Sequence, residues 1–130
     1  MQPHLIALTI LPLLTMLGAC STAETPATPR PQPAEATSTE AYMHWLGRWQ
    51  GTEGTYLELS HHDRAFTVLI HDLDGAATYP GDAQADGIVF VRAGRFERLH
   101  SGDGKATGMK WLLDKRDCLV IRDGEGYCRD

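Results

Sequence analysis

The chain has 130 residues, of which 42% are apolar and 22% are charged, and its formal net charge is −5. This composition is that of an ordinary globular protein and excludes a fibrous or wholly disordered chain. The length leaves room for one full domain. The acidic balance excludes a general nucleic-acid binder, whose electrostatic footprint is a basic patch and a high isoelectric point.

The N-terminal segment has the features of a secretory signal. Residues 1–19 contain no Asp, Glu, Lys or Arg, and 5–17 is almost wholly apolar. That run is too short to span a bilayer core, which needs roughly 20 residues. A short apolar core followed by small residues is typical of a cleaved signal peptide. The run ends in Leu17-Gly18-Ala19-Cys20, which resembles the lipobox of bacterial lipoproteins.

The lipobox resemblance implies a lipid anchor. It implies attachment of diacylglycerol to the Cys20 thiol, cleavage before Cys20, and acylation of the new N-terminus with a chain such as palmitate. Two or three acyl chains anchor a protein stably in a membrane. The n-region lacks the usual Lys or Arg, and Ser21 stands where an Asp often directs inner-membrane retention. By that analogy we expect a lipoprotein on the periplasmic face of the outer membrane.

The remaining chain divides into a tether and one domain. Residues 20–40 are the lipidated cysteine and a Pro/Thr-rich segment with nothing to pack, so we expect a disordered tether. Residues 41–130 hold every Trp and Phe of the chain and form the domain. A helical turn is predicted at 42–46. Short runs rich in β-branched and aromatic residues then predict strands at 55–60, 65–71, 76–79, 87–92, 95–100, 107–112, 117–122 and 126–129.

These spacings predict the fold class. Runs 8 to 12 residues apart, with tight turns between them, favour an all-β antiparallel meander. Strand edges must be protected, so we expect closure into a barrel of roughly eight strands. Within 107–112, alternation sends Lys110 outward and Trp111 inward. The segment 80–82 is predicted to be a turn.

One disulfide is predicted in the last hairpin. With Cys20 lipidated, Cys118 and Cys128 are the remaining thiols of an exported, oxidised protein. A hairpin centred on Asp123 places Cys118 opposite Cys128 and Leu119 opposite Tyr127, and cross-strand neighbours are close enough to bridge.

A short motif suggests the kind of barrel. Gly47-Arg48-Trp49 stands at the entry to the first strand and resembles the Gly-x-Trp signature of lipocalins and related calycin barrels. The resemblance implies that Trp49 plugs one barrel end beneath an arginine from a late strand, for which Arg122 and Arg129 are available. The chain is far shorter than a lipocalin, so we expect a mostly packed barrel with at most a shallow cup.

A second resemblance is architectural. Lipoprotein inhibitors of c-type lysozyme are also lipid-anchored, disulfide-stapled small barrels, and their inhibitory loops carry a Ser-Gly motif and a Lys. Here Ser101-Gly102 and Lys105 offer a similar interaction loop, although the rest of that pattern is absent.

The sequence supports no catalytic site, metal site or cofactor. Ser60, His62 and Asp63 are too close in one turn to form a triad. His61 and His62 are about one strand length from His71, too far for one zinc ion. We therefore expect a non-catalytic binding or envelope-interaction module, whose partners are membrane lipid through acylated Cys20 and a small apolar ligand or an envelope protein. The alternative is an inhibitor of a lysozyme-type cell-wall hydrolase.

Overall fold

The computed structural model describes residues 38–130. The expected signal peptide, Cys20 and the tether up to residue 37 lie outside the described residues. The described part begins with a helical turn at 38–41, followed by the 3-10 helix η1 (Met43–Trp45). The helical segment therefore starts earlier than the predicted turn at 42–46. Tyr42 fixes it to the barrel, because its hydroxyl donates a hydrogen bond of 2.6 Å to the carbonyl oxygen of Gln84.

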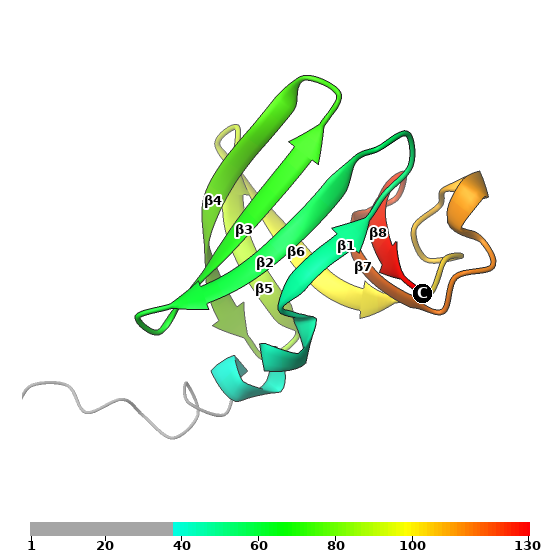
Figure 1. Ribbon diagram of the computed structural model, residues 1–130. Coiled ribbons are helices and arrows are strands. Elements are labelled where there is room, and N and C mark those ends of the chain that lie inside the picture. Colours follow the sequence, from blue (N-terminus) through cyan, green and yellow to red (C-terminus); the bar gives the residue numbers. More distant parts are fainter. Residues whose placement is uncertain (1–37) are drawn as a thin grey trace, which may run out of the picture. The chain divides into compact units, whose positions relative to one another are not determined.

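The rest of the described chain is an all-β closed barrel (Figure 1). Each strand pairs antiparallel with its neighbour in chain order, and the last strand pairs with the first. The strands are β1 (Gly47–Gln50), β2 (Tyr56–His62), β3 (Ala65–Asp72), β4 (Gly75–Gln84), β5 (Gly87–Arg92), β6 (Arg95–Gly102), β7 (Asp117–Arg122) and β8 (Glu125–Arg129). This confirms the predicted fold class, including the helical turn and the disulfide. No helix within 38–130 is long and apolar enough to cross a membrane.

Alternating side chains fill the inside of the barrel. In β3, buried Phe66, Val68 and Ile70 alternate with less buried neighbours, which is the period of a strand with one face in a core. β2 shows the same alternation, whereas β7 and β8 contain runs of consecutive buried residues. The buried residues that make up the interior are Trp49, Leu57, Leu59, Phe66, Val68, Ile70, Ile88, Phe90, Leu99, Leu119, Ile121 and Tyr127. An eight-stranded barrel is just wide enough to be filled by such side chains.

Two local predictions are wrong. Residues 107–112 are not a strand, because they form turns and the 3-10 helix η2 (Lys110–Leu112). The barrel still has eight strands, because a strand that was not predicted, β1, forms at the Gly-x-Trp motif. The alternation in 107–112 was misleading because Met109 and Leu112 pack against the outside of the barrel, in a second small core.

The predicted turn at 80–82 is also wrong, since β4 runs through it. Pro80 lies opposite Thr67 in the β3–β4 ladder, whereas the β4–β5 ladder starts only at Gly81, opposite Phe90. Proline has no N–H to donate to a ladder. Pro80 therefore stands where β5 separates from β4.

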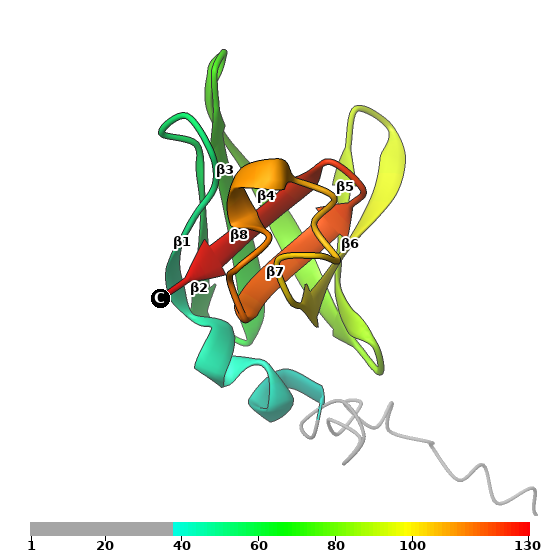
Figure 2. The ribbon, with the colours of Figure 1, turned by 90° about the vertical axis from the view of Figure 1, so that its right-hand side faces the viewer.

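The barrel wall is incomplete at one end. β6 pairs with β7 only through His100, Ser101 and Gly102, so the first half of β6 has no partner on that side within the described chain. Figure 2 shows the β3–β4 and β5–β6 hairpins diverging at this end. We call it the open end; it carries the turns at 51–55, 73–74, 93–94 and 123–124. The opposite end, next to η1, is the closed end.

The segment 103–116 crosses the outer face of β7 and β8 (Figure 2). Leu112 packs there with Cys118 and Cys128, and these three residues form the second small core. Two backbone hydrogen bonds of 2.8 Å hold the segment, from Gly104 N–H to the Lys115 carbonyl and from Gly124 N–H to the Thr107 carbonyl. The disulfide thus lies between the sheet and this covering segment, which fixes the position of η2.

Candidate functional site

The closed end is sealed by tryptophan and arginine. Trp49 is 1% exposed, and its indole N–H donates a hydrogen bond of 2.7 Å to the Trp45 carbonyl oxygen. The Arg129 guanidinium lies 3.9 Å from the centre of a Trp49 ring, a favourable cation–π geometry. Arg129 also donates hydrogen bonds to the carbonyl oxygens of His44, Trp45 and Leu46. These contacts tie β8 to η1 and to the residue that precedes β1.

The Gly-x-Trp motif has a steric basis. Gly47 has a φ of 100°, and a Cβ added there would lie 3.3 Å from the Arg129 guanidinium. Glycine therefore lets the arginine approach the indole. Of the two arginines available for this place, Arg129 occupies it, while Arg122 lies at the open end.

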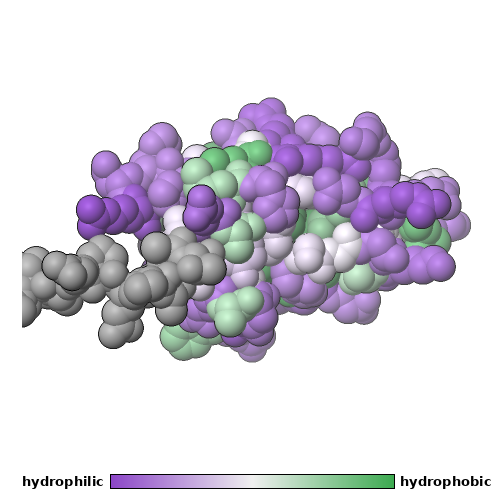
Figure 3. All heavy atoms as spheres, turned by 90° about the horizontal axis from the view of Figure 1, so that it is seen from below, coloured by the Kyte–Doolittle hydropathy of each residue, from purple (hydrophilic) through white to green (hydrophobic). Residues whose placement is uncertain are grey.

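Seen from the side on which η1 lies (Figure 3), the surface is mostly hydrophilic, with apolar residues in small separate patches.

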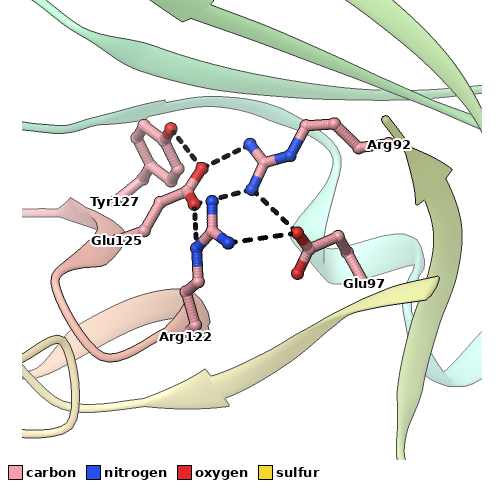
Figure 4. Close-up of polar contacts among 5 residues, drawn as sticks. All are labelled: Arg92, Glu97, Arg122, Glu125 and Tyr127. Carbon is pink, nitrogen blue, oxygen red and sulfur yellow. Dashed lines mark hydrogen bonds and ion pairs between the residues drawn. The ribbon is translucent and has the colours of Figure 1, made fainter. Parts of the chain in front are cut away.

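The open end is held by an ion-pair network (Figure 4). Arg92 donates hydrogen bonds of 2.6 and 2.7 Å to the two carboxylate oxygens of Glu125, and its guanidinium is 3.3 Å from Glu97. Arg122 is the second arginine of the network and lies 3.0 Å from Glu125 and 3.4 Å from Glu97. Tyr127 donates a hydrogen bond of 3.4 Å to Glu125. The network joins the β5–β6 hairpin to the β7–β8 hairpin, across the place where β6 and β7 are not paired.

Burial and charge act against each other on Glu125. Burial raises the pKa of this carboxyl, but the hydrogen bonds and charge of Arg92, together with Arg122, outweigh it and hold the pKa below its ordinary value of 4.5. Burial, with the nearby Glu125 carboxylate, raises the pKa of the Tyr127 phenol well above its ordinary value. Tyr127 therefore stays protonated and remains a donor to Glu125.

A shallow cavity of about 390 Å³ lies at the open end. Most of its lining side chains are polar or charged, and they include Thr55, Asp72, Arg92 and Tyr127. The arginines there are already bound by carboxylates, and the buried apolar side chains fill the barrel below. This mouth is a poor receptor for an apolar molecule, because binding one would bury charged groups away from water.

A larger groove of about 730 Å³ lies on the outer surface. It runs between the outer face of β1 and the segment that carries η2, over the seam at which β1 and β8 share one registered pair, Gln50 with Cys128. One wall is the indole of Trp111, which is 78% exposed. The remaining lining residues are Arg48, Gln50, Gly51, Thr52, Glu53, Leu112, Lys115, Cys128, Arg129 and Asp130.

The two walls of this groove are held in place. On the η2 side, Leu112 is buried over the disulfide, so Trp111 is presented by a fixed backbone. On the β1 side, Arg48 pairs with Glu58 at 2.9 Å, and its guanidinium lies 4.0 Å from the ring centre of Tyr56. The groove is therefore pre-formed, which lowers the entropy cost of binding.

The position of Trp111 corrects a sequence prediction. Alternation predicted that Trp111 points inward and Lys110 outward, but Trp111 is among the most exposed large side chains of 38–130. The neighbouring Leu112 takes the buried place instead. The reason is the 3-10 helix, in which consecutive side chains point about a third of a turn apart rather than to opposite faces.

The predicted disulfide is present. Cys118 is bonded to Cys128, and the strand register places Leu119 opposite Tyr127 as the hairpin arithmetic predicted. Both cysteines are buried, on the outward face of the hairpin beneath the covering segment.

The predicted interaction loop at Ser101 and Lys105 lies where β6 ends and the covering segment begins. Both residues are exposed. Between them Gly104 is buried, and a Cβ there would lie 1.6 Å from the Leu112 carbonyl oxygen. Gly104 is thus packed against the η2 end of the covering segment, while Ser101, Asp103 and Lys105 face solvent.

The histidines considered as metal ligands, His61, His62 and His71, are dispersed along the β2–β3 pair. The His61 ring lies 4.8 Å from the ring of Phe66, and the His71 ring stacks on Tyr56 at 4.8 Å. His71 and His61 belong to opposite ends of the ladder. Nowhere in 38–130 do three or more His, Cys, Asp or Glu side chains come together as a group able to hold a metal ion.

Sequence reasoning missed the network at the open end. Arg92 and Glu97 continue the inward-facing registers of Phe90 and Leu99, so charged residues follow a run of buried ones on each strand. A charged residue at the next inward-facing position of a strand indicates an ion pair, because an inward-facing charge near a barrel end requires a partner. Its partner Glu125 begins β8 next to Gly124 and Gly126, a sequence typical of a turn, so no local pattern indicates its role.

Comparison with known proteins gives no relative: no family model, curated protein or solved structure matches the chain. The fold and its closed end define a small eight-stranded antiparallel barrel, which is compatible with a lipocalin-like barrel.

Proposed function

We propose that this protein is a non-catalytic binding module, held by lipidated Cys20 at the periplasmic face of the outer membrane, and that it binds an envelope component through the groove beside Trp111. The observation that carries the proposal is the pairing of a filled barrel with a largely exposed tryptophan on a fixed surface. A filled interior supports recognition outside the barrel rather than within it.

The exposure of Trp111 needs a physical reason. An indole 78% exposed leaves a large apolar ring in water, at a cost of the order of 1.5–3 kcal/mol relative to burial. Tryptophan is also the residue type most enriched among the side chains that dominate binding energies. A partner that covers Trp111 recovers that free energy, and the fixed η2 backbone keeps the ordering cost small.

The test is the material bound to the protein in the cell. Full-length tagged protein is extracted from bacterial membranes in mild detergent, and native mass spectrometry identifies any envelope component that co-purifies. We expect the component to be retained by the wild type and lost from Trp111→Ala. The matched control is Phe96→Ala, since Phe96 is 83% exposed but lies outside the groove. Equal retention by both variants contradicts the proposal.

The lipid anchor has its own test. Metabolic labelling with a palmitate analogue should mark the wild-type chain, because the lipobox resemblance makes Cys20 the acylated residue. Cys20→Ala should be unlabelled and should leave the membrane fraction. A wild-type chain without label contradicts the anchor but leaves the binding groove to be judged by the experiment above.

The alternative function is inhibition of a lysozyme-type hydrolase through Ser101 and Lys105. Its structural support is that both side chains are exposed on one segment next to the disulfide core. The measurement is the rate of cell-wall lysis by c-type lysozyme with micromolar wild-type protein. A lower rate that is restored by Lys105→Ala supports the inhibitor, and an unchanged rate eliminates it.

A further inference from the structure

We propose that the groove beside Trp111 is an oligosaccharide-binding site, in which one sugar ring lies against the indole and its neighbours lie along β1. This inference rests on the proposed function and names the chemical class of its ligand. It is carried by the lining of the groove, which joins one exposed flat aromatic ring to polar side chains without internal partners.

The aromatic wall suits a pyranose ring. A pyranose has one face made largely of C–H groups, and an aromatic ring carries negative charge on its face, so the two attract when stacked. Trp111 forms one side of the groove, and its side chain is 78% exposed. The Lys110 ammonium lies over the Trp111 ring, 5.4 Å from its centre, and Lys110 is not among the residues that line the groove.

The opposite wall offers hydrogen bonds. Gln50, Thr52 and Glu53 line the groove, and within residues 38–130 no hydrogen bond occupies their side chains. Together they present an amide, a hydroxyl and a carboxylate, which can both donate to and accept from sugar hydroxyls. Glu53 holds a φ of 55° in the turn beside Gly54, a conformation that is unfavourable for a side chain other than glycine's. Glu53 is exposed in that turn and lines the groove.

The charges of the groove disfavour a polyanion. Arg48 is paired with Glu58, Lys115 is paired with Asp130, and Arg129 is stacked on Trp49. The basic groups that line the groove are therefore neutralised or committed elsewhere, while Glu53 adds a negative charge. Polyanion sites instead present unpaired Lys and Arg. A chain of neutral sugars fits this balance better than a phosphate polymer.

The size of the groove fits a short run of sugars. Ligand sites generally enclose about 300–1,000 Å³, and this groove measures about 730 Å³. Its two walls come from β1 and from η2, so a chain can continue along the surface beyond them. Polymers of sugars are chains of this kind.

The chain carries its own reporter for the test. Trp45 and Trp49 are buried, whereas Trp111 is exposed, so a ligand that enters the groove changes the fluorescence of one tryptophan in particular. Purified full-length protein is titrated with three neutral hexasaccharides: cellohexaose, maltohexaose and the hexamer of N-acetylglucosamine. We expect a saturable change with at least one of them, and protection of the exposed fluorescence from acrylamide quenching.

Variants separate the site from non-specific effects. Binding measured by calorimetry should weaken about tenfold or more in Trp111→Ala, as for an aromatic residue that dominates a binding site. Gln50→Ala should weaken it less, and Phe96→Ala should leave it unchanged. No binding by any of the three sugars at millimolar concentration overturns the proposal, as does binding that survives Trp111→Ala.

The outcomes also distinguish this inference from the proposed function. If the sugars do not bind but an envelope component still co-purifies with the wild type and not with Trp111→Ala, the groove binds another class of molecule and only the oligosaccharide is wrong. If neither sugar nor component depends on Trp111, both proposals fail together.

Discussion

The closed end and the open end of the barrel are held by different interactions. At the closed end, Trp49 is buried beneath Arg129. The guanidinium of this arginine makes a cation–π contact with the indole and donates hydrogen bonds to backbone carbonyls. At the open end, Arg92 and Arg122 form ion pairs with Glu97 and Glu125. Dispersion and apolar burial dominate the first arrangement, and charge pairing dominates the second.

The difference follows from the backbone at each end. The closed end has η1 to lay across it, so apolar side chains can be removed from water there. The open end has unpaired strand edges between β6 and β7, and the charged side chains that bridge them are 12–18% exposed for Arg92, Glu97 and Glu125. Charged side chains can bridge such a gap while remaining partly hydrated. We therefore expect the closed end to set the stability of the fold and the open end to set its local flexibility.

The largest effect is expected at the closed end. Trp49→Ala should lower the free energy of unfolding by about 3–5 kcal/mol, as for a large aromatic side chain in a core. Chemical denaturation monitored by circular dichroism measures it. The matched control is Trp111→Ala, which should change stability by less than about 0.5 kcal/mol because the side chain is exposed. Similar losses in the two variants would mean that the closed end does not carry the fold.

The disulfide joins β7 to β8 at one registered pair of the last hairpin. Reduction should lower the free energy of unfolding by about 2–3 kcal/mol, the chain-entropy value for so short a loop. Because the bond lies beneath the covering segment, Cys118→Ala/Cys128→Ala should also loosen η2. Hydrogen exchange should then be faster at the amides of Gly104 and Gly124. Unchanged exchange at these two amides would show that their hydrogen bonds hold the segment without the bridge.

An intermediate effect is expected at the open end. Glu125→Gln should cost about 2 kcal/mol, between the values for buried and exposed ion pairs, because it leaves Arg92 and Arg122 to share the Glu97 carboxylate alone. The control is Glu58→Gln, which breaks the exposed Arg48 pair and should cost less than about 1 kcal/mol. Hydrogen exchange should quicken in β5 and β6 in the first variant only. Equal losses of stability in the two variants would mean that the ion pairs of the open end contribute no more than an exposed ion pair.

Much of the fold was predictable from the sequence. Strands such as 87–92 and 117–122 alternate or run apolar between clear turn residues, and in both cases the predicted and observed limits agree. Cys118 and Cys128 were predictable as a pair because they are the thiols left once Cys20 is lipidated and because a hairpin centred on Asp123 places them opposite each other, as the observed register does. Pattern and local turn chemistry are sufficient wherever a strand has one face in the core.

The candidate site was much less predictable. Periodicity cannot tell a strand from a segment that packs on the outside of a barrel, which is why Trp111 was placed inside and Leu112 outside. The groove itself joins β1 to residues more than 60 positions later, so no local pattern could predict it. The network of Arg92 and Glu125 depends likewise on a contact between distant hairpins.

The smallest effect is expected from acid pH, which should weaken the open end and leave the closed end unchanged. Glu125 faces Arg92 from β5, Glu97 from β6, Arg122 from β7 and Tyr127 from its own strand, while Asp72 of β3 also lines the mouth. The paired arginines hold the pKa of Glu125 below its ordinary value of 4.5. A carboxyl with a lowered folded-state pKa stabilises the fold above its unfolded pKa, and the contribution is lost as the pH falls through the folded pKa.

The stability advantage of the wild type over Glu125→Gln should therefore be constant near neutral pH and should shrink as the pH falls below 4.5. The corresponding difference for Trp49→Ala should stay nearly constant, since no carboxylate takes part in the Trp49 contacts described above. Urea denaturation of the three proteins at a series of pH values measures both differences. A Glu125→Gln difference that does not change with pH would mean that the open end is held by packing, as the closed end is, and not by charge.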